Sequence, residues 1–345
     1  MIHNLLQTLI NIPFFSSVTF GIIAMIAVGS SWCLIGFVMG NAPKKGIEPS
    51  LIQFLGFLFA AICSTGIMLG TKSIPTCSWN TIFFTCSLIG LGGFLNFFML
   101  QIMSCAMQRG PNGIIWSIIQ SALVFPFIVG ILFFNVQFSF TRLIGIICLL
   151  ASLALFAFTK NNQSTNNNWR ILAFLCLFIA AVQQNLTSIP SYYQEAKAVN
   201  SITRALASSC GGLLAAIFYN IIKMNKNFWV KLGSNLKNKT LWRYIIALQF
   251  FNLIFAYTLF YPGMNAMADA GLGGMSYPMM VGSCIISFSL TALLILKEKF
   301  TLIQIGAIII CISGLILICI PISAKNNSSK SYNTITTTTT VKQVK

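Results

Sequence analysis

Neutral polar side chains lie inside the long apolar stretches of this 345-residue chain, and they are the groups best suited to bind a solute. In a bilayer an amide without a partner is costly, so such side chains face a cavity or one another. Aromatic rings cover the apolar face of a pyranose, and amides hydrogen-bond its hydroxyls. The candidate substrate-binding residues are Trp116, Gln120, Gln184, Asn185, Asn252 and Tyr277. The alternative is that each of them bonds neighbouring helices together.

Carboxylates are scarce, and their positions limit the function. The chain has four acids: Glu48, Glu195, Asp269 and Glu298. None falls in the middle of an apolar stretch, where a carboxylate would serve proton coupling or the binding of a cation. Proton-driven drug export is therefore disfavoured. Glu195, which follows a polar stretch, is a candidate gate or proton site, and a solvated loop acid is the alternative.

The sequence contains no signature of a soluble enzyme. His3 is the single histidine, and no cysteine pair has the spacing of a metal site. There is no Gly-rich phosphate loop with a lysine, no Ser/His/Asp set and no pair of carboxylates. We therefore predict no enzymatic activity, no metal and no cofactor.

Composition identifies a membrane protein. Hydrophobic residues make up 57% of the chain and charged residues 7%, which is unlike a soluble domain. The net charge of +17 fits short loops beside an anionic membrane surface better than binding of nucleic acid. A bilayer-spanning helix needs roughly 20 apolar residues. By that length, helical spans are expected near residues 18–40, 51–70, 80–104, 111–134, 141–159, 169–189, 201–223, 242–263, 272–296 and 302–322.

Two stretches of the chain correspond at a constant spacing. Gly110 to Gly145 aligns without a gap with Gly271 to Gly306, which pairs Trp116 with Tyr277. The alternative is a chance match of apolar segments. An internal repeat with five spans per half, an odd number, enters the membrane with inverted orientation.

The predicted organisation is all-α, with ten transmembrane helices in two inverted five-helix repeats. Its parts are an interfacial segment 1–17, a first repeat 18–159, a linker 160–168, a second repeat 169–322 and a disordered tail 323–345. Of the 21 Lys and Arg residues, 13 fall in loops after odd-numbered spans. The other 8, which include Arg142 and Arg204, are assigned to the opposite side. The positive-inside rule then puts both termini outside.

The hairpin Lys297-Glu298-Lys299-Phe300-Thr301, with Gly306 downstream, resembles the end of the second repeat in the drug/metabolite transporter superfamily. In the first copy Gln137 replaces the expected acid. The resemblance covers residues 18–322 and implies an EamA-like ten-helix transporter. The length, the polar sixth span and Lys44-Lys45 after the first span look most like the sugar porters that include the L-rhamnose–proton symporters. Proton symport, if implied, leaves Glu195 as the nearest candidate.

We therefore expect a secondary-active or facilitative transporter that moves a small neutral polar solute, with a sugar favoured, by alternating access. Export of amino acids or other metabolites is the alternative, and a non-transporting receptor or scaffold is the alternative of another class. The expected partners are the small-molecule substrate, a coupling proton or sodium ion, and the lipid bilayer. We expect a monomer or homodimer in a bacterial inner membrane.

Overall fold

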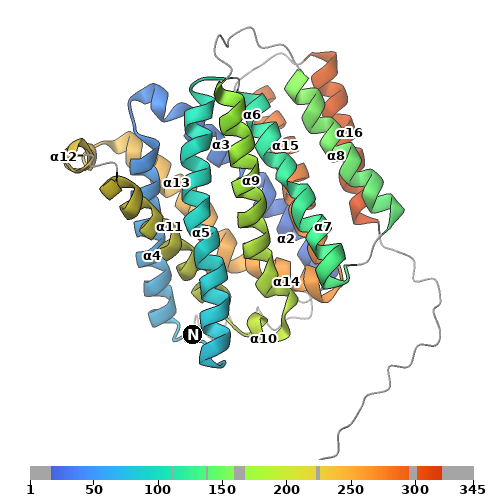
Figure 1. The fold of residues 1–345 in the computed structure, drawn as a ribbon, viewed down its shortest axis with the longest axis horizontal. Helices are drawn as coiled ribbons and strands as arrows, with labels where there is room; N and C mark the ends of the chain where they lie inside the picture. Colours follow the sequence, from blue (N-terminus) through green and yellow to red (C-terminus); the bar gives the residue numbers. More distant parts are fainter. Residues whose placement is uncertain are drawn as a thin grey trace, which may run out of the picture.

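The computed structural model describes residues 17–110, 112–136, 139–158, 168–222, 226–294 and 301–320. Every regular element within these residues is a helix, and most run roughly parallel to one axis as a bundle (Figure 1). Eight of the described helices are long and apolar enough to cross a membrane, and the apolar segment Phe140–Leu155 is shorter. The chain is therefore a helical protein of the multi-pass membrane type.

The helices of residues 18–158 form the first half of the bundle. They are α2 (Val18–Ser31), α3 (Cys33–Asn41), η1 (Pro43–Lys45), α4 (Pro49–Gly70), α5 (Trp79–Met107), α6 (Asn112–Gln120), η2 (Ser121–Leu123), α7 (Val124–Phe134) and α8 (Phe140–Phe158). The pairs α2–α3 and α6–η2–α7 each form one interrupted span.

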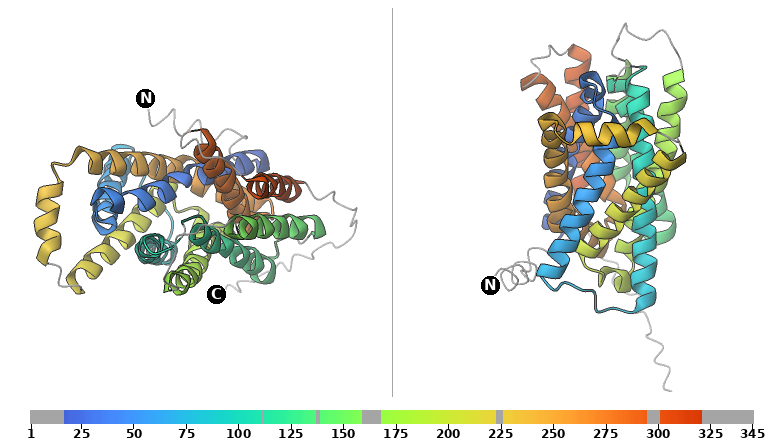
Figure 2. Two further views of the ribbon diagram at one scale, coloured as in Figure 1. Left: turned by 90° about the horizontal axis from the view of Figure 1, so that it is seen from above. Right: turned by 90° about the vertical axis from the view of Figure 1, so that its left-hand side faces the viewer.

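The helices of residues 168–319 continue the bundle. They are α9 (Asn168–Ser188), η3 (Ile189–Tyr192), α10 (Gln194–Lys197), α11 (Ser201–Ile222), α12 (Lys226–Asn235), α13 (Lys239–Phe255), the π-helix η4 (Ala256–Phe260), α14 (Tyr261–Asp269), η5 (Gly273–Met275), α15 (Ser276–Leu294) and α16 (Leu302–Cys319). Figure 2 shows that α12 lies across the bundle rather than along it.

Sequence signals explain where several helices begin. Ser78 caps α5 by accepting a hydrogen bond from the Thr81 N–H at 3.2 Å. Thr301 and Gln304 form a reciprocal capping box at the start of α16, in which each side chain accepts from the backbone N–H of the other residue. The predicted beginning of the last span at residue 302 agrees with this cap.

The outer face of the bundle is apolar. Phe83 is 73% exposed, Phe133 73% and Ile171 71%. Large apolar side chains in contact with water would be unfavourable over so wide a surface, whereas hydrocarbon tails accommodate them. Polar side chains, in contrast, are found inside the bundle. This arrangement supports the membrane assignment independently of helix length.

Close helix crossings depend on glycine. A Cβ atom at Gly93 of α5 would overlap the backbone of Ser208 on α11, and one at Gly29 of α2 would overlap the backbone of Met280 on α15. The most extensive helix contacts join α5 to α9 and α11, α8 to α16, α4 to α11, and α2 to α15. Helices from the two halves of the chain are thus interleaved rather than segregated.

Two of the cations that we counted in loops lie elsewhere. Arg142 lies in α8 and is 2% exposed, and Arg204 lies in α11 and is 0% exposed. Both side chains are therefore buried within helices rather than exposed in loops.

Several predicted segments fall outside the described residues. They are the interfacial segment 1–17 except Ser17, the linker 160–168 except Asn168, the hairpin residues Lys297 to Phe300, Gln137, and the tail 323–345.

Candidate functional site: a polar cavity inside the bundle

A cavity of about 240 Å³ lies among the helices, and its wall is built from both halves of the chain. The spans α2–α3, α4, α5 and α6 contribute from the first half, and α9, α11, α13–η4–α14 and α15 from the second. The wall contains seven side-chain amides: Gln53, Asn96, Gln120, Gln183, Gln184, Gln249 and Asn252. Among the lining residues none carries a charge.

Buried amide atoms without a protein partner occur in this wall. Gln53 is 4% exposed, and neither atom of its amide forms a hydrogen bond within the protein. Gln184 is 5% exposed, and its Oε1 likewise has no partner. An unmade hydrogen bond of this kind costs about 1–3 kcal/mol. These amides are therefore available to a polar solute in the cavity.

Aromatic rings face the same space. Trp116, 9% exposed, lies against Gly36, where an added Cβ would meet the indole at 3.5 Å. The rings of Trp32 and Tyr277 are 6.2 Å apart at an angle of 44°. All three rings line the cavity. Rings beside amides give a surface that can accommodate both faces of a polyhydroxylated ring.

Five of the six predicted substrate-binding residues line this cavity: Trp116, Gln120, Gln184, Asn252 and Tyr277. Asn185 does not line it. Its Nδ2 donates to the carbonyl of Ala181 at 2.8 Å, one turn earlier in the same helix. Asn185 follows Gln184 directly, so the two side chains point in directions about 100° apart on the helix.

Gln53 was not among the predicted site residues. The signal was an amide near the start of α4, inside a span whose other residues are mostly apolar. Asn96, Gln183 and Gln249 also line the cavity but were outside our candidate set.

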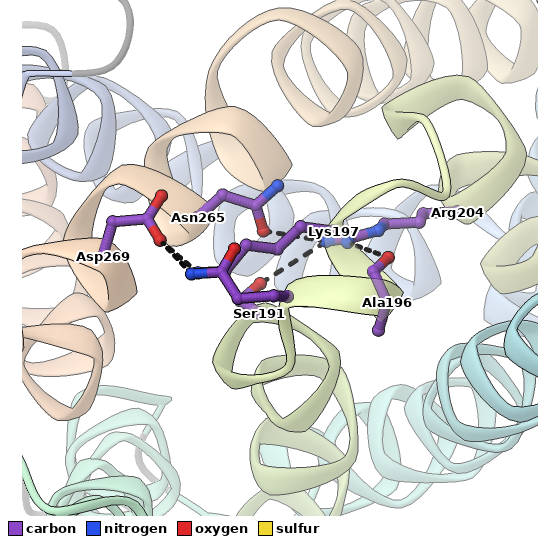
Figure 3. A network of polar contacts seen from close by, with 7 residues as sticks. Ser191, Ala196, Lys197, Arg204, Asn265 and Asp269 are labelled. Carbon is purple, nitrogen blue, oxygen red and sulfur yellow. Dashed lines mark hydrogen bonds and ion pairs between the residues drawn. The ribbon is translucent and has the colours of Figure 1, made fainter. Parts of the chain in front are cut away.

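Glu195 lies outside the cavity. It belongs to the short helix α10 and is exposed. Lys197, which the sequence places beside it, pairs instead with Asp269 at the end of α14, and Gln194 donates to the same carboxylate oxygen at 3.2 Å (Figure 3). Asp269 is 47% exposed, so this ion pair contributes little to stability.

The two halves of the chain are in aromatic contact where η3 meets α7. The ring of Tyr192 stacks on Phe134 with 4.1 Å between centroids and 7° between planes. On its other side Tyr192 lies so close to Gly273 that any side chain there would collide with it. Because α7 and η3 belong to different halves, this contact joins the two halves.

No group of three or more His, Cys, Asp or Glu side chains in the part of the chain that the structure describes is placed to hold an ion.

Comparison with known proteins defines the fold but not the function. No protein-family model matches the sequence, and no curated protein matches it. Twenty-eight chains of solved structures match the fold. One of them, described as "Crystal structure of protein", has a TM-score of 0.58 at 12% identity and covers 85% of this chain and 95% of its own. At that identity the likeness shows a shared helical fold alone.

Proposed function

We propose that this protein is a secondary-active or facilitative membrane transporter for a small polyhydroxylated solute of the sugar class. The observation that carries the proposal is the cavity wall, in which buried amides without protein partners stand beside Trp32, Trp116 and Tyr277. An apolar bundle has no structural need for partnerless amides, since apolar side chains would fill the same space at lower cost.

The helix contacts support two inverted five-helix repeats. If α2–α3 corresponds to α9 and α5 corresponds to α13–η4–α14, each contact between two helices should have an equivalent contact between their counterparts. Helix α5 packs on α9, and α14 with η4 packs on α2. Likewise α6 packs on α8 and α9, while α15 packs on α16 and α2. A site between inverted repeats is the arrangement that alternating access uses.

This arrangement also agrees with the resemblance to the drug/metabolite transporter superfamily and its sugar porters. In that case the halves rock about the bound solute, and the ring contact of Tyr192 with Phe134 between them separates. The cavity wall contains no carboxylate from the described residues. Coupling to a proton would therefore need a group outside the cavity, and facilitated transport needs none.

The test is solute binding by the detergent-purified protein, measured as a rise in melting temperature across monosaccharides, amino acids and nucleosides. We expect a monosaccharide to raise it and to enter proteoliposomes that contain the protein. The Trp116→Ala/Tyr277→Ala double variant should lose both responses. Trp79→Ala is the matched control, because Trp79 is 79% exposed and does not line the cavity.

Other outcomes favour the alternatives. A response to amino acids alone would favour a metabolite exporter. Unchanged sugar transport by the double variant at normal expression would overturn the assigned site. No flux of any solute in vesicles would favour a receptor or scaffold.

A further inference from the structure

A buried arginine without a carboxylate partner stands directly behind the cavity wall. Arg204 lies in the first turn of α11, is 0% exposed, and precedes Ala205, which lines the cavity. An arginine side chain keeps its charge at any physiological pH. The cavity therefore has a fixed positive charge beside it.

Neutral groups alone hold this guanidinium. Its Nη2 donates to the carbonyl of Ala196 at 2.7 Å (Figure 3). Its Nη1 donates to Asn265 Oδ1 at 3.1 Å and to Ser191 Oγ at 3.4 Å, while Nε has no partner. The ion pair found among the described residues is that of Lys197 with Asp269, which leaves Arg204 without a counter-charge.

The charge is separated from the cavity by one side chain. The Cζ atom of Arg204 is 5.8 Å from the centre of the Tyr261 ring, and Tyr261 lines the cavity. The Tyr261 hydroxyl donates to the backbone carbonyl of Arg204 at 3.5 Å. No acid among the described residues lines the cavity to offset this charge. In a protein interior, where screening is weak, a unit charge acts over several ångströms.

We infer that the transported solute is a sugar acid, with its hydroxyls on the cavity amides and its single carboxylate at the end near Tyr261. The inference rests on the proposed function and changes one property of the solute, its charge. The uncompensated cation lowers the free energy of a bound carboxylate and raises that of an ammonium group. The cation therefore also disfavours binding of amines. It disfavours amino acids as well, because their ammonium group would find no acid among the described lining residues.

The experiment compares three solutes that share one pyranose ring: glucose, which is neutral, glucuronate, which is an anion, and glucosamine, which is a cation at mildly acidic pH. Binding to the full-length protein in detergent is measured by melting temperature and by equilibrium titration. We expect glucuronate to bind at least about tenfold more tightly than glucose, which corresponds to about 1.4 kcal/mol. Glucosamine should bind most weakly.

Amino-acid substitutions test whether Arg204 causes the preference for glucuronate over glucose. In Arg204→Gln, which can keep hydrogen bonds but has no charge, glucuronate and glucose should bind within about twofold of each other. Arg142→Gln is the matched control, because Arg142 is also a buried arginine but lies in α8, which contributes no residue to the cavity wall, and this variant should keep the preference. If Arg204→Gln does not fold, Arg204→Lys retains the charge and should retain the order.

The failures can be told apart. Glucose binding as tightly as glucuronate, or more tightly, overturns this inference and leaves the sugar transporter in place. Absence of binding by all three solutes overturns both.

Discussion

Gln53 is the residue at which stability and function should be in conflict. Both atoms of its amide are buried without a protein partner, and it lines the cavity. We expect Gln53→Met to raise the free energy of unfolding by about 1 kcal/mol, because an apolar side chain of similar size removes an unmade hydrogen bond. Solute binding and flux should fall. Melting temperature and vesicle uptake measure the two effects.

Gln101 supplies the control for that prediction. Its Nε2 is also buried without a partner, but Gln101 does not line the cavity. Gln101→Met should therefore raise stability and leave uptake unchanged. A loss of uptake in both variants, or in neither, would show that the partnerless amide of Gln53 has no role specific to the cavity.

At the scale of elements, the crossing of α5 and α11 limits side-chain size. A Cβ at Gly93 would overlap the Ser208 carbonyl, and backbone atoms cannot move aside as a flexible side chain can. We expect Gly93→Ala to destabilise the protein by about 1–3 kcal/mol, as overpacking generally does. It should also disturb the solute site, because Ser208 lines the cavity. A lower melting temperature and weaker solute binding are the readouts.

Gly66 of α4 is the contrasting position. A Cβ there would meet nothing within 4 Å. Gly66→Ala should leave binding unchanged and raise stability by up to about 1 kcal/mol through helix propensity. If the two alanine variants behaved alike, the glycine of the α5–α11 crossing would have no special packing role.

Eight of the ten predicted spans correspond to helices that are long and apolar enough to cross a membrane, and the spans predicted at 141–159 and 272–296 are not among those eight. Burying roughly 20 apolar residues in lipid is a local requirement that each segment meets by itself, so the sequence can predict such positions. The second predicted span, 51–70, corresponds to α4 at Pro49–Gly70, and the seventh, 201–223, to α11 at Ser201–Ile222. The interruptions were not predicted. The π-helix at Ala256–Phe260 precedes Pro262, which cannot donate its backbone bond, and its form depends on the packing around it.

The site was predictable only in part, for a related reason. Polar residue types inside apolar spans identify candidates, but the helix face that meets the cavity is set by tertiary packing. Gln184 and Asn185 are adjacent in sequence, yet only Gln184 lines the cavity. Arg204 looked like a loop cation because it lies near the beginning of a span, and its burial follows from η3, α10 and α14 packing around it.

At the scale of the whole molecule, the two halves of the chain depend on each other for their cores. Helix α5 of the first half packs on α9 and α11 of the second, and α8 packs on α16. Buried apolar residues of α2 and α15, such as Met25 and Met280, belong to one hydrophobic cluster. Separating the two halves would expose to lipid the helix faces that form these contacts.

We therefore expect neither half, divided within residues 160–168, to yield a stable folded protein when expressed alone. Co-expression of both halves should restore a one-to-one complex, because the packing faces are complementary and the linker supplies only connectivity. Size-exclusion chromatography reports the assembly, and a sugar-induced rise in melting temperature reports the cavity. A single half that is monodisperse and heat-stable by itself would contradict the interleaved arrangement, since its α5 or α11 face would then be satisfied without its partner.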